Sequence, residues 1–277
     1  MSTTAPDRNE LPYLTSLRGL SAMAVLAFHC NWIDWGNQGV DVFFMLSGYI
    51  LTWGHMQKPR SPVAFWIARV KRIFPTHIVA TFLVGSVIVL VGGDTIWRLV
   101  ADIALFPILA DSKMPVNGTT WSLAVEWLAY LAFPFFIGAF RRAPVIGVVF
   151  CGAAYFSTAT IFPEAGWLPC IWRGVSEFGI GAALAGSGWE PRCHEWLNWI
   201  DSPPVRFLGD ISFPLYLIQA LPLFLLCKGG HRDAGVGFVP HIEAALVALL
   251  LAISLHLLVE QPAQNWFKKS RTTLALT

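Results

Sequence analysis

Eight long apolar stretches, each about the length of a membrane span, constrain the fold of this 277-residue chain more than any other feature. A helix needs about 20 mainly apolar residues to cross the hydrocarbon core of a bilayer. The stretches lie at about residues 14–33, 39–55, 75–93, 119–140, 144–162, 171–188, 206–227 and 242–260. Charged residues make up only 13% of the chain, whereas they make up about 25% of a soluble domain. We therefore expect an all-α membrane helix bundle of about eight transmembrane helices, forming a single domain over residues 1–277.

Lysine and arginine are distributed unevenly between the predicted loops, and this distribution predicts the orientation. Most of the 19 basic residues fall on the cytoplasmic side if the N-terminus is cytoplasmic. We therefore place both termini in the cytoplasm and expect a multi-pass protein of the cell membrane, which is the inner membrane in a Gram-negative bacterium. The densest basic run, RSPVAFWIARVKRIFP at 60–75, is predicted to form a helix on the cytoplasmic surface. Residues 96–109 are predicted to form an interfacial amphipathic helix, because Arg98 and Asp102 lie four residues apart.

Arg18 and His29 are ionisable residues inside the first predicted span. Eleven residues turn a helix by three turns plus about 20°, so both side chains lie on one face, roughly 16 Å apart along the axis. Ionisable groups in a span are costly, which makes both residues candidates for function. Two simpler interpretations stay open. Arg18 could be an interfacial anchor, and His29 could be a packed histidine with a backbone partner.

The fourth predicted span carries a polar stripe, because Ser122, Glu126 and Tyr130 follow one another at intervals of four residues. We expect Glu126 and His29 at a similar depth near the outer surface, where the carboxylate would fix the tautomer of the imidazole. Asp41, at the outer start of the second span, is the next candidate for that role. Each carboxylate also has a structural interpretation: Glu126 could pair with an arginine for packing, and Asp41 could stabilise the N-terminus of its own helix.

Arg173 and Glu177 lie one turn apart at the outer end of the sixth span. They could form a local ion pair, or they could line an external pocket for an acceptor. The other residues expected in that acceptor pocket are Trp121, Ser122 and Tyr130.

Arg69 and Arg72 lie three residues apart in the basic run. On a helix they would place two guanidinium groups on one face, which suits a phosphate-rich ligand. They also fit the ordinary excess of basic residues on the cytoplasmic side.

At these residues the sequence resembles the acyltransferase-3 family of integral membrane acyltransferases. The matching pieces follow the family's order from about residue 11 to 267: Arg18 with His29, GVDVFFMLSGYIL at 39–51, RVKR at 69–72 followed by IFP, WSLAVEW at 121–127, GDISFPLYLIQ at 209–219, and Glu260-Gln-Pro262. The sequence departs from the family twice. It has room for about eight spans where the family usually has about ten, and Gln219 stands where the family often has a histidine.

The resemblance implies the transfer of an acyl group, with acetyl expected, from cytoplasmic acyl-CoA to a hydroxyl of a carbohydrate or similar acceptor at the outer face. It implies His29 as the catalytic base, and Arg18 as a residue that assists the donor or orients the site. It also implies that Arg69 and Arg72 bind the phosphates of CoA. Acyl-CoA would then be a co-substrate, and we expect no permanently bound cofactor, no metal and no nucleic acid.

Two other classes of function are compatible with the same residues. Histidine and glutamate inside a membrane also form proton relays, so a proton-coupled transporter is one alternative. A non-catalytic membrane partner that binds acyl-CoA or a polysaccharide is the other. The residue pattern does not distinguish direct transfer from a covalent acyl-histidine step, and it leaves open the acyl chain, the acceptor and the oligomeric state.

Overall fold

The computed structural model describes residues 12–107, 114–161, 167–189, 199–227 and 238–274, and within these ranges every regular element is a helix. The α-helices are α1 (Pro12–His29), α2 (Gly39–Gln57), α3 (Pro62–Gly92), α4 (Ile96–Ile103), α5 (Thr120–Arg142), α6 (Pro144–Ile161), α7 (Trp167–Gly186), α8 (Pro203–Asp210), α9 (Ser212–Ile218), α10 (Ala220–Leu226), α11 (Phe238–Leu255) and α12 (Gln261–Leu274). A π-helical turn, His256–Glu260, joins α11 to α12. The predicted all-α class is confirmed.

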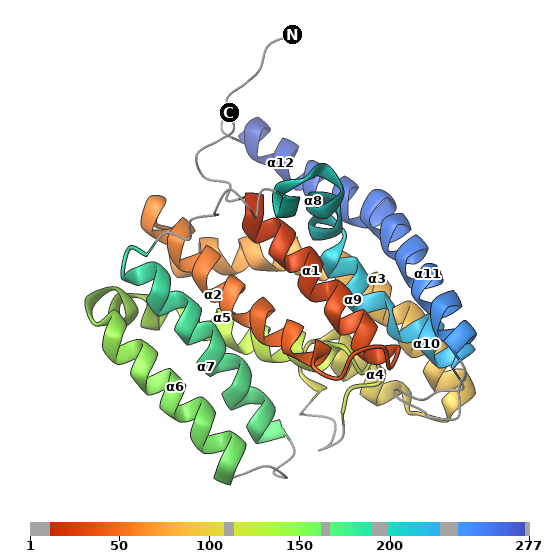
Figure 1. Cartoon of the computed structure of the whole chain (residues 1–277). Coiled ribbons are helices and arrows are strands. Elements are labelled where there is room, and N and C mark those ends of the chain that lie inside the picture. Colours follow the sequence, from red (N-terminus) through yellow and green to blue (C-terminus); the bar gives the residue numbers. More distant parts are fainter. Residues whose placement is uncertain (1–11, 108–113, 162–166, 190–198, 228–237, 275–277) are drawn as a thin grey trace.

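Helix α1 runs through the middle of the molecule, between α2 on one side and α8 with α9 on the other (Figure 1). α2 packs against α7, and α7 packs against α6 at the edge of the bundle. α3 contacts α5 and α9, and α11 borders the side opposite α6 (Figure 1). The first residues of α1 and the helix α12 lie at the same end of the bundle. The polar residues of α1, α2, α3 and α5 can therefore meet inside the molecule.

The structure contains apolar helices that are long enough to cross a membrane. In the described chain they are fewer than the eight predicted spans. By length and composition, three helices of the described chain could cross a membrane: Pro62–Gly92, Thr120–Arg142 and Val239–Lys269. The pair Pro203–Asp210 and Ser212–Leu226, bent by 51°, could form a fourth span. All eight predicted stretches contain helices, but their number as membrane spans and the side of the termini stay predictions.

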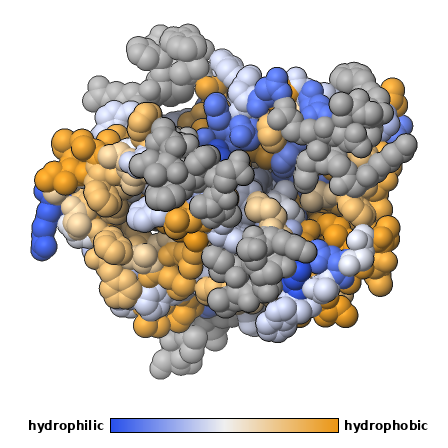
Figure 2. All heavy atoms as spheres, turned by 90° about the horizontal axis from the view of Figure 1, so that it is seen from below, coloured by the Kyte–Doolittle hydropathy of each residue, from blue (hydrophilic) through white to orange (hydrophobic). Residues whose placement is uncertain are grey.

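Apolar side chains point outward from these helices, as expected of a protein surrounded by lipid. Leu90 of α3 is 83% exposed, Val145 of α6 is 73% exposed, and Leu258 in the π-turn is 76% exposed. Seen from below, apolar residues gather on the two flanks of the molecule, and polar residues lie nearer the middle and the upper rim (Figure 2). This outward arrangement agrees with a membrane helical protein.

The basic run is not a separate surface helix, which corrects the sequence-based expectation. It forms the first half of α3, a continuous helix of 31 residues that contains Pro75. Ser61 caps the start, because its hydroxyl accepts a hydrogen bond from the backbone N–H of Ala64 at 3.3 Å, and Pro62 suits the first helical position. At 1.5 Å per residue the helix is about 46 Å long, longer than a hydrocarbon core of about 30 Å. Its basic half can therefore stay outside the lipid.

The amphipathic helix predicted at 96–109 is shorter than expected, and the ion pair of Arg98 has a different partner. α4 has eight residues, and Arg98 pairs with Asp94 rather than with Asp102. Asp102 is fully buried and accepts a hydrogen bond from the backbone N–H of Asn117 at 2.9 Å and another from the hydroxyl of Thr120. The aspartate thus anchors the start of α5 instead of facing a membrane surface.

Two glycines allow α2 and α7 to pack with their backbones in contact. A Cβ atom on Gly48 would lie 2.0 Å from the carbonyl oxygen of Phe178, and one on Gly181 would lie 1.9 Å from that of Met45. Small residues that permit such close approach are typical of helix pairs in membranes. This contact fixes the position of α2, whose Phe44 and Ser47 are buried and whose Asp41 and Phe43 are half-buried.

Candidate functional site

Glu126 of α5 lies at the centre of the polar interior. Its Oε1 atom accepts hydrogen bonds from the hydroxyls of Ser47 on α2 and Tyr130 on α5. The side chain of Glu126 lines two adjoining pockets, which also have Arg18 and Phe213 in common. Glu126 thus lines both pockets and is hydrogen-bonded to residues of α2 and α5. It can contact a ligand in either pocket.

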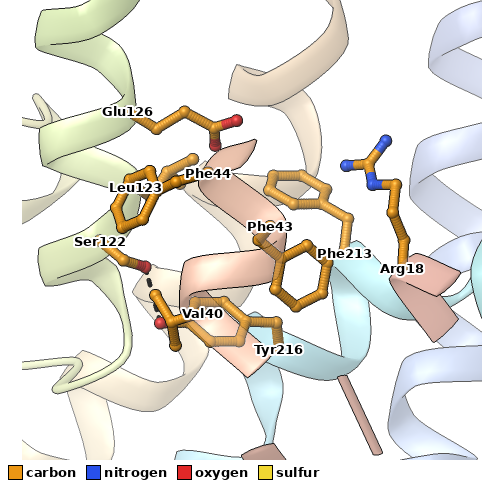
Figure 3. Close-up of a pocket in the computed structure, with 9 residues that line it drawn as sticks. All are labelled: Arg18, Val40, Phe43, Phe44, Ser122, Leu123, Glu126, Phe213 and Tyr216. Carbon is orange, nitrogen blue, oxygen red and sulfur yellow. Dashed lines mark hydrogen bonds between the residues drawn. The ribbon is translucent and has the colours of Figure 1, made fainter. Parts of the chain in front are cut away.

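The first of these, the aromatic pocket, is lined by Val40, Phe43, Phe44, Ser122, Leu123 and Tyr216 in addition to the shared residues. Arg18 and Glu126 approach it from opposite sides, with Phe43 and Phe213 between them (Figure 3). At its far end the hydroxyls of Ser122 and Tyr216 are hydrogen-bonded at 2.6 Å. Most of the wall is therefore apolar. Its polar groups are those of Arg18, Glu126 and the hydrogen-bonded pair of Ser122 and Tyr216.

The second, the polar pocket, is lined by Ser47, Ile50, Leu51, Arg69, Arg72, Ile73 and Tyr130 in addition to the shared residues. Arg18 lies within electrostatic reach of Arg72, Glu126 and Glu260. Three guanidinium groups, those of Arg18, Arg69 and Arg72, thus lie near two carboxylates. These carboxylates belong to Glu126 and Glu260. The charges around this pocket leave an excess of one positive charge, which favours an anionic ligand.

A third pocket, the basic pocket, opens at the surface between α3 and α12. It is lined by Ala68, Arg69, Lys71, Arg72, Gln264, Phe267 and Lys268. Arg69 and Arg72 line both the basic pocket and the polar pocket. The three pockets therefore follow one another in a row, from a cationic surface through Arg69 and Arg72, past Arg18 and Glu126, to Ser122 and Tyr216.

His29 is the last residue of α1, and its ring lies 5.6 Å from the ring of Phe28. It is not among the lining residues of the three pockets. Within the part of the chain that the structure describes, Glu126 forms hydrogen bonds with Ser47 and Tyr130 rather than with His29. The expected contact between this carboxylate and the imidazole is thus not formed.

For Asp41, the second candidate partner of His29, the position is set by how α2 meets α1. A Cβ atom on Gly39 would lie 2.5 Å from the carbonyl oxygen of Ser21 and 2.9 Å from the side chain of Val25. α2 therefore starts beside Ser21, about 12 Å of helix rise before His29. Counting residues from each predicted membrane surface assumed that all helices start at the same level, which this contact contradicts.

Asp41 and Glu177 both bind Arg173. The Nε atom of Arg173 donates to Oδ1 of Asp41 at 2.6 Å and lies 3.5 Å from Oε1 of Glu177. The local pair with Glu177 is present as expected, but the shorter bond ties α7 to α2. Asp41 thus has Arg173 as its partner, whereas the sequence suggested His29.

The residues expected to form an acceptor pocket are divided between several places. Ser122 lines the aromatic pocket, Tyr130 lines the polar pocket, and the ring of Trp121 lies 6.4 Å from that of Phe44. Arg173 and Glu177 line none of the three pockets. Their assignment to an acceptor pocket stays a prediction.

Comparison with known proteins decides the family. A family model described as an acyltransferase domain matches residues 11–200 of the chain. This chain belongs to the acyltransferase-3 family. The resemblance inferred from the motifs is thereby confirmed.

Two curated relatives of this acyltransferase-3 chain come from bacteria. It is 32% identical over 257 residues to the acyltransferase MdmB of Streptomyces mycarofaciens, across 82% of this chain and 60% of that protein. It is 31% identical over 165 residues to the peptidoglycan O-acetyltransferase OatA of Listeria monocytogenes, across 50% of this chain and 26% of that protein. The chain thus covers less than two thirds of either relative's length. No solved structure matches it.

Sequence reasoning about this acyltransferase-3 chain missed two residues of the site. The sequence places Glu260 in the Glu260-Gln-Pro262 motif and Phe213 in the GDISFPLYLIQ motif, and neither motif assigns the residue a role. Glu260 binds Arg72 across 188 positions of sequence, and Phe213 lines both inner pockets. The sequence did contain a sign of the role of Glu260. A carboxylate at the end of an apolar helix is costly, and it therefore indicates a partner of opposite charge.

Proposed function

We propose that this chain transfers an acyl group, with acetyl as the expected group, from acyl-CoA to a hydroxyl of a carbohydrate or similar acceptor. The observation that carries the proposal is the row of three pockets from a cationic surface to an apolar interior. The name of the Listeria relative, a peptidoglycan O-acetyltransferase, supports an acyl donor and a carbohydrate hydroxyl as acceptor.

The basic pocket suits the anionic end of acyl-CoA. Lys71 and Lys268 lie at its rim with Arg69 and Arg72, and guanidinium groups bind phosphate oxygens through two parallel hydrogen bonds. The narrow pantetheine arm would then enter the polar pocket past these arginines. The positive charges that line the basic pocket would hold the donor's anionic groups at this end of the row, away from the mainly apolar aromatic pocket.

The chemistry requires a base on the acceptor side. We assign this role to His29 from the family's Arg18–His29 motif. Because His29 lines none of the three pockets, the acyl group would have to extend beyond the aromatic pocket to reach it. The acceptor oxygen forms a bond to the thioester carbon while His29 takes the hydroxyl proton. The C–S bond then breaks, and the CoA thiolate leaves and recovers a proton from His29. Arg18 lies three helical turns, roughly 16 Å, from His29, so we assign it to orienting the donor arm rather than to binding the oxyanion at His29.

The test uses purified protein in detergent or lipid, labelled acetyl-CoA and candidate sugars. We expect His29→Ala to lower acyl transfer at least about 100-fold and to keep its affinity for CoA, as the loss of a general base predicts. The double variant Arg69→Ala with Arg72→Ala should instead lose CoA affinity. Arg206→Ala is the matched control, because Arg206 forms an exposed ion pair with Asp201 away from the pockets.

Full activity of His29→Ala would contradict the mechanism, and unchanged CoA affinity in the double variant would contradict the donor site. Uptake of a solute driven by a proton gradient, without release of CoA in the presence of acceptors, would favour the transporter instead. Binding of acyl-CoA without turnover by the wild type would favour the non-catalytic partner.

A further inference from the structure

We infer that Glu260 is a positioning residue of the donor site, which holds Arg72 in the wall between the polar and basic pockets and leaves Arg69 as the guanidinium that receives the donor's anionic group. The two arginines of the RVKR motif would then have different tasks, although they lie on one helix face. This inference rests on the proposed function, because it names which cation binds the acyl-CoA.

Glu260 is enclosed by three partners. Its side chain is only 2% exposed, and its Oε1 atom forms the ion pair with Arg72 and accepts a hydrogen bond from Nε2 of Gln264 at 3.1 Å. Its Oε2 atom lies 2.8 Å from Nδ1 of His256. Both carboxylate oxygens are therefore bound from defined directions, which fixes the side chain and, through it, Arg72.

The imidazole of His256 is held between Glu260 and Gln261. The amide Nε2 of Gln261 lies 2.9 Å from Nε2 of His256, and an amide N–H can only donate. Nε2 of the imidazole therefore accepts, Nδ1 carries the proton, and it donates to Glu260. Arg72 is the arginine bonded to this carboxylate within the described chain.

The π-helical turn explains how a carboxylate at the end of an apolar helix reaches α3. His256–Glu260 adds an extra residue to the turn, and this rotates the following residues by about 100° relative to α11. Glu260 thereby faces Arg72, and the next helix, α12, brings Phe267 to 5.0 Å from Nζ of Lys71. Turns of this kind are often found at functional sites.

Arg72 is not free to move to a phosphate. Its departure would leave Glu260 as a buried and unpaired negative charge, which proteins do not tolerate without a large loss of stability. Its role is therefore to form part of the wall between the two pockets at a fixed place.

Arg69 is different. It has neither a hydrogen bond nor an ion pair to the described residues, its Nε atom is buried without a partner, and its guanidinium lies 5.7 Å from the ring of Phe65. It lines the same two pockets as Arg72. Arg69 is thus the cation whose hydrogen-bonding groups are available to an incoming anion.

The experiment measures binding of CoA itself and steady-state kinetics with acetyl-CoA for Arg69→Ala, Arg72→Ala, Glu260→Gln and the double variant Arg72→Ala with Glu260→Gln. Arg206→Ala is the control for the loss of a cation. We expect Arg69→Ala to weaken CoA binding about tenfold or more, as for the loss of a hydrogen bond to a charged group. Arg72→Ala should weaken it less than Arg69→Ala does.

Glu260→Gln should raise KM for acetyl-CoA while kcat stays within about twofold, because the side chain acts through Arg72 and not on the reacting atoms. In the Arg72→Ala background the same change should add nothing to KM. A purely structural role would lower the amount of active protein, and therefore the apparent kcat, in both backgrounds.

Three results would overturn the inference: CoA affinity that falls equally in the two single arginine variants or falls more in Arg72→Ala, an unchanged KM in Glu260→Gln, or an undiminished effect of Glu260→Gln in the Arg72→Ala background. If Glu260→Gln does not fold, the comparison of the two arginine variants decides alone. A wild type that binds no CoA would refute the proposed function and this inference together. A wild type that binds CoA, with variants that bind it equally well, would refute the inference alone.

Discussion

At the scale of single residues, Glu126 connects the two inner pockets, and its charge is expected to matter more for turnover than for binding. Replacement by Gln keeps the shape and the contact with Ser47 and Tyr130 but removes a negative charge near Arg18. We expect Glu126→Gln to lower kcat by up to about 100-fold, the size that a misplaced substrate can cost, because Glu126 lies beside Arg18 on the donor's path and not at His29. CoA affinity should stay the same or increase, because a carboxylate that repels the anionic donor is removed. A loss of CoA affinity in this variant would contradict this account.

The residue scale also separates what the sequence could predict from what it could not. The interval of four predicted the stripe of Ser122, Glu126 and Tyr130, and all three side chains do line the inner pockets. The spacing within one helix carries no information about the level at which another helix meets it. The predicted contact of Glu126 or Asp41 with His29 was therefore wrong. Glu126 is bonded to Ser47 and Tyr130, and Asp41 is bonded to Arg173.

At the scale of helices, the contact between α2 and α7 holds the site in place, and its glycines provide a test. Gly48→Ala places a methyl group 2.0 Å from the carbonyl oxygen of Phe178, so the two helices must separate. We expect a loss of about 1–3 kcal/mol, seen as a lower Tm in detergent together with lower activity. Gly54→Ala in the same helix is the matched control, because nothing lies within 4 Å of its new atom. Equal Tm values for the two variants would argue against close packing at Gly48.

The anchor of α5 predicts a dependence of stability on pH. Asp102 lies in α4, outside the membrane-length helices, and burial raises its pKa from 3.8 to about 7. The folded protein therefore binds this proton more tightly than the unfolded chain does. The stabilisation is fully present below about pH 4 and is lost as the pH rises through about 7.

We accordingly expect the Tm of the wild type to fall between pH 5 and pH 8 relative to that of Asp102→Asn, which cannot titrate at this position. Thermal unfolding of both proteins in one detergent across this range is the measurement. Parallel curves would mean that Asp102 does not carry the shifted proton.

The elements also differed in how far their sequences predicted them. The all-α class followed from the length of the apolar stretches alone. The start of α3 at Pro62 is also indicated by the sequence, because Ser61 is a typical N-cap residue. The sequence does not show that the basic run and the apolar stretch at about 75–93 form one helix, because a proline separates them and prolines often end helices, whereas here the helix continues through Pro75. The π-turn at His256–Glu260 could not be read from apolar periodicity, since it is stabilised by Arg72 from a distant helix.

At the scale of the whole molecule, the row of pockets has two chemically different ends. One end is cationic and lies at the surface beside α12, and the other is mainly aromatic and lies near the start of α5. Since α1 begins and α12 lies at the same end of the bundle, the basic pocket belongs to that end (Figure 1). An enzyme built in this way should accept its donor and its acceptor from opposite faces of the membrane.

Sidedness of the donor is therefore the most direct test of acyl transfer along this row of pockets. The protein is reconstituted in sealed vesicles, its orientation is determined by labelling near Lys268, and acetyl-CoA is supplied on one face at a time. We predict that labelled acetyl reaches the acceptor only when acetyl-CoA is on the face that carries Lys268 and the acceptor is on the other. Equal transfer from either face, or transfer only when both substrates share a face, would contradict the account.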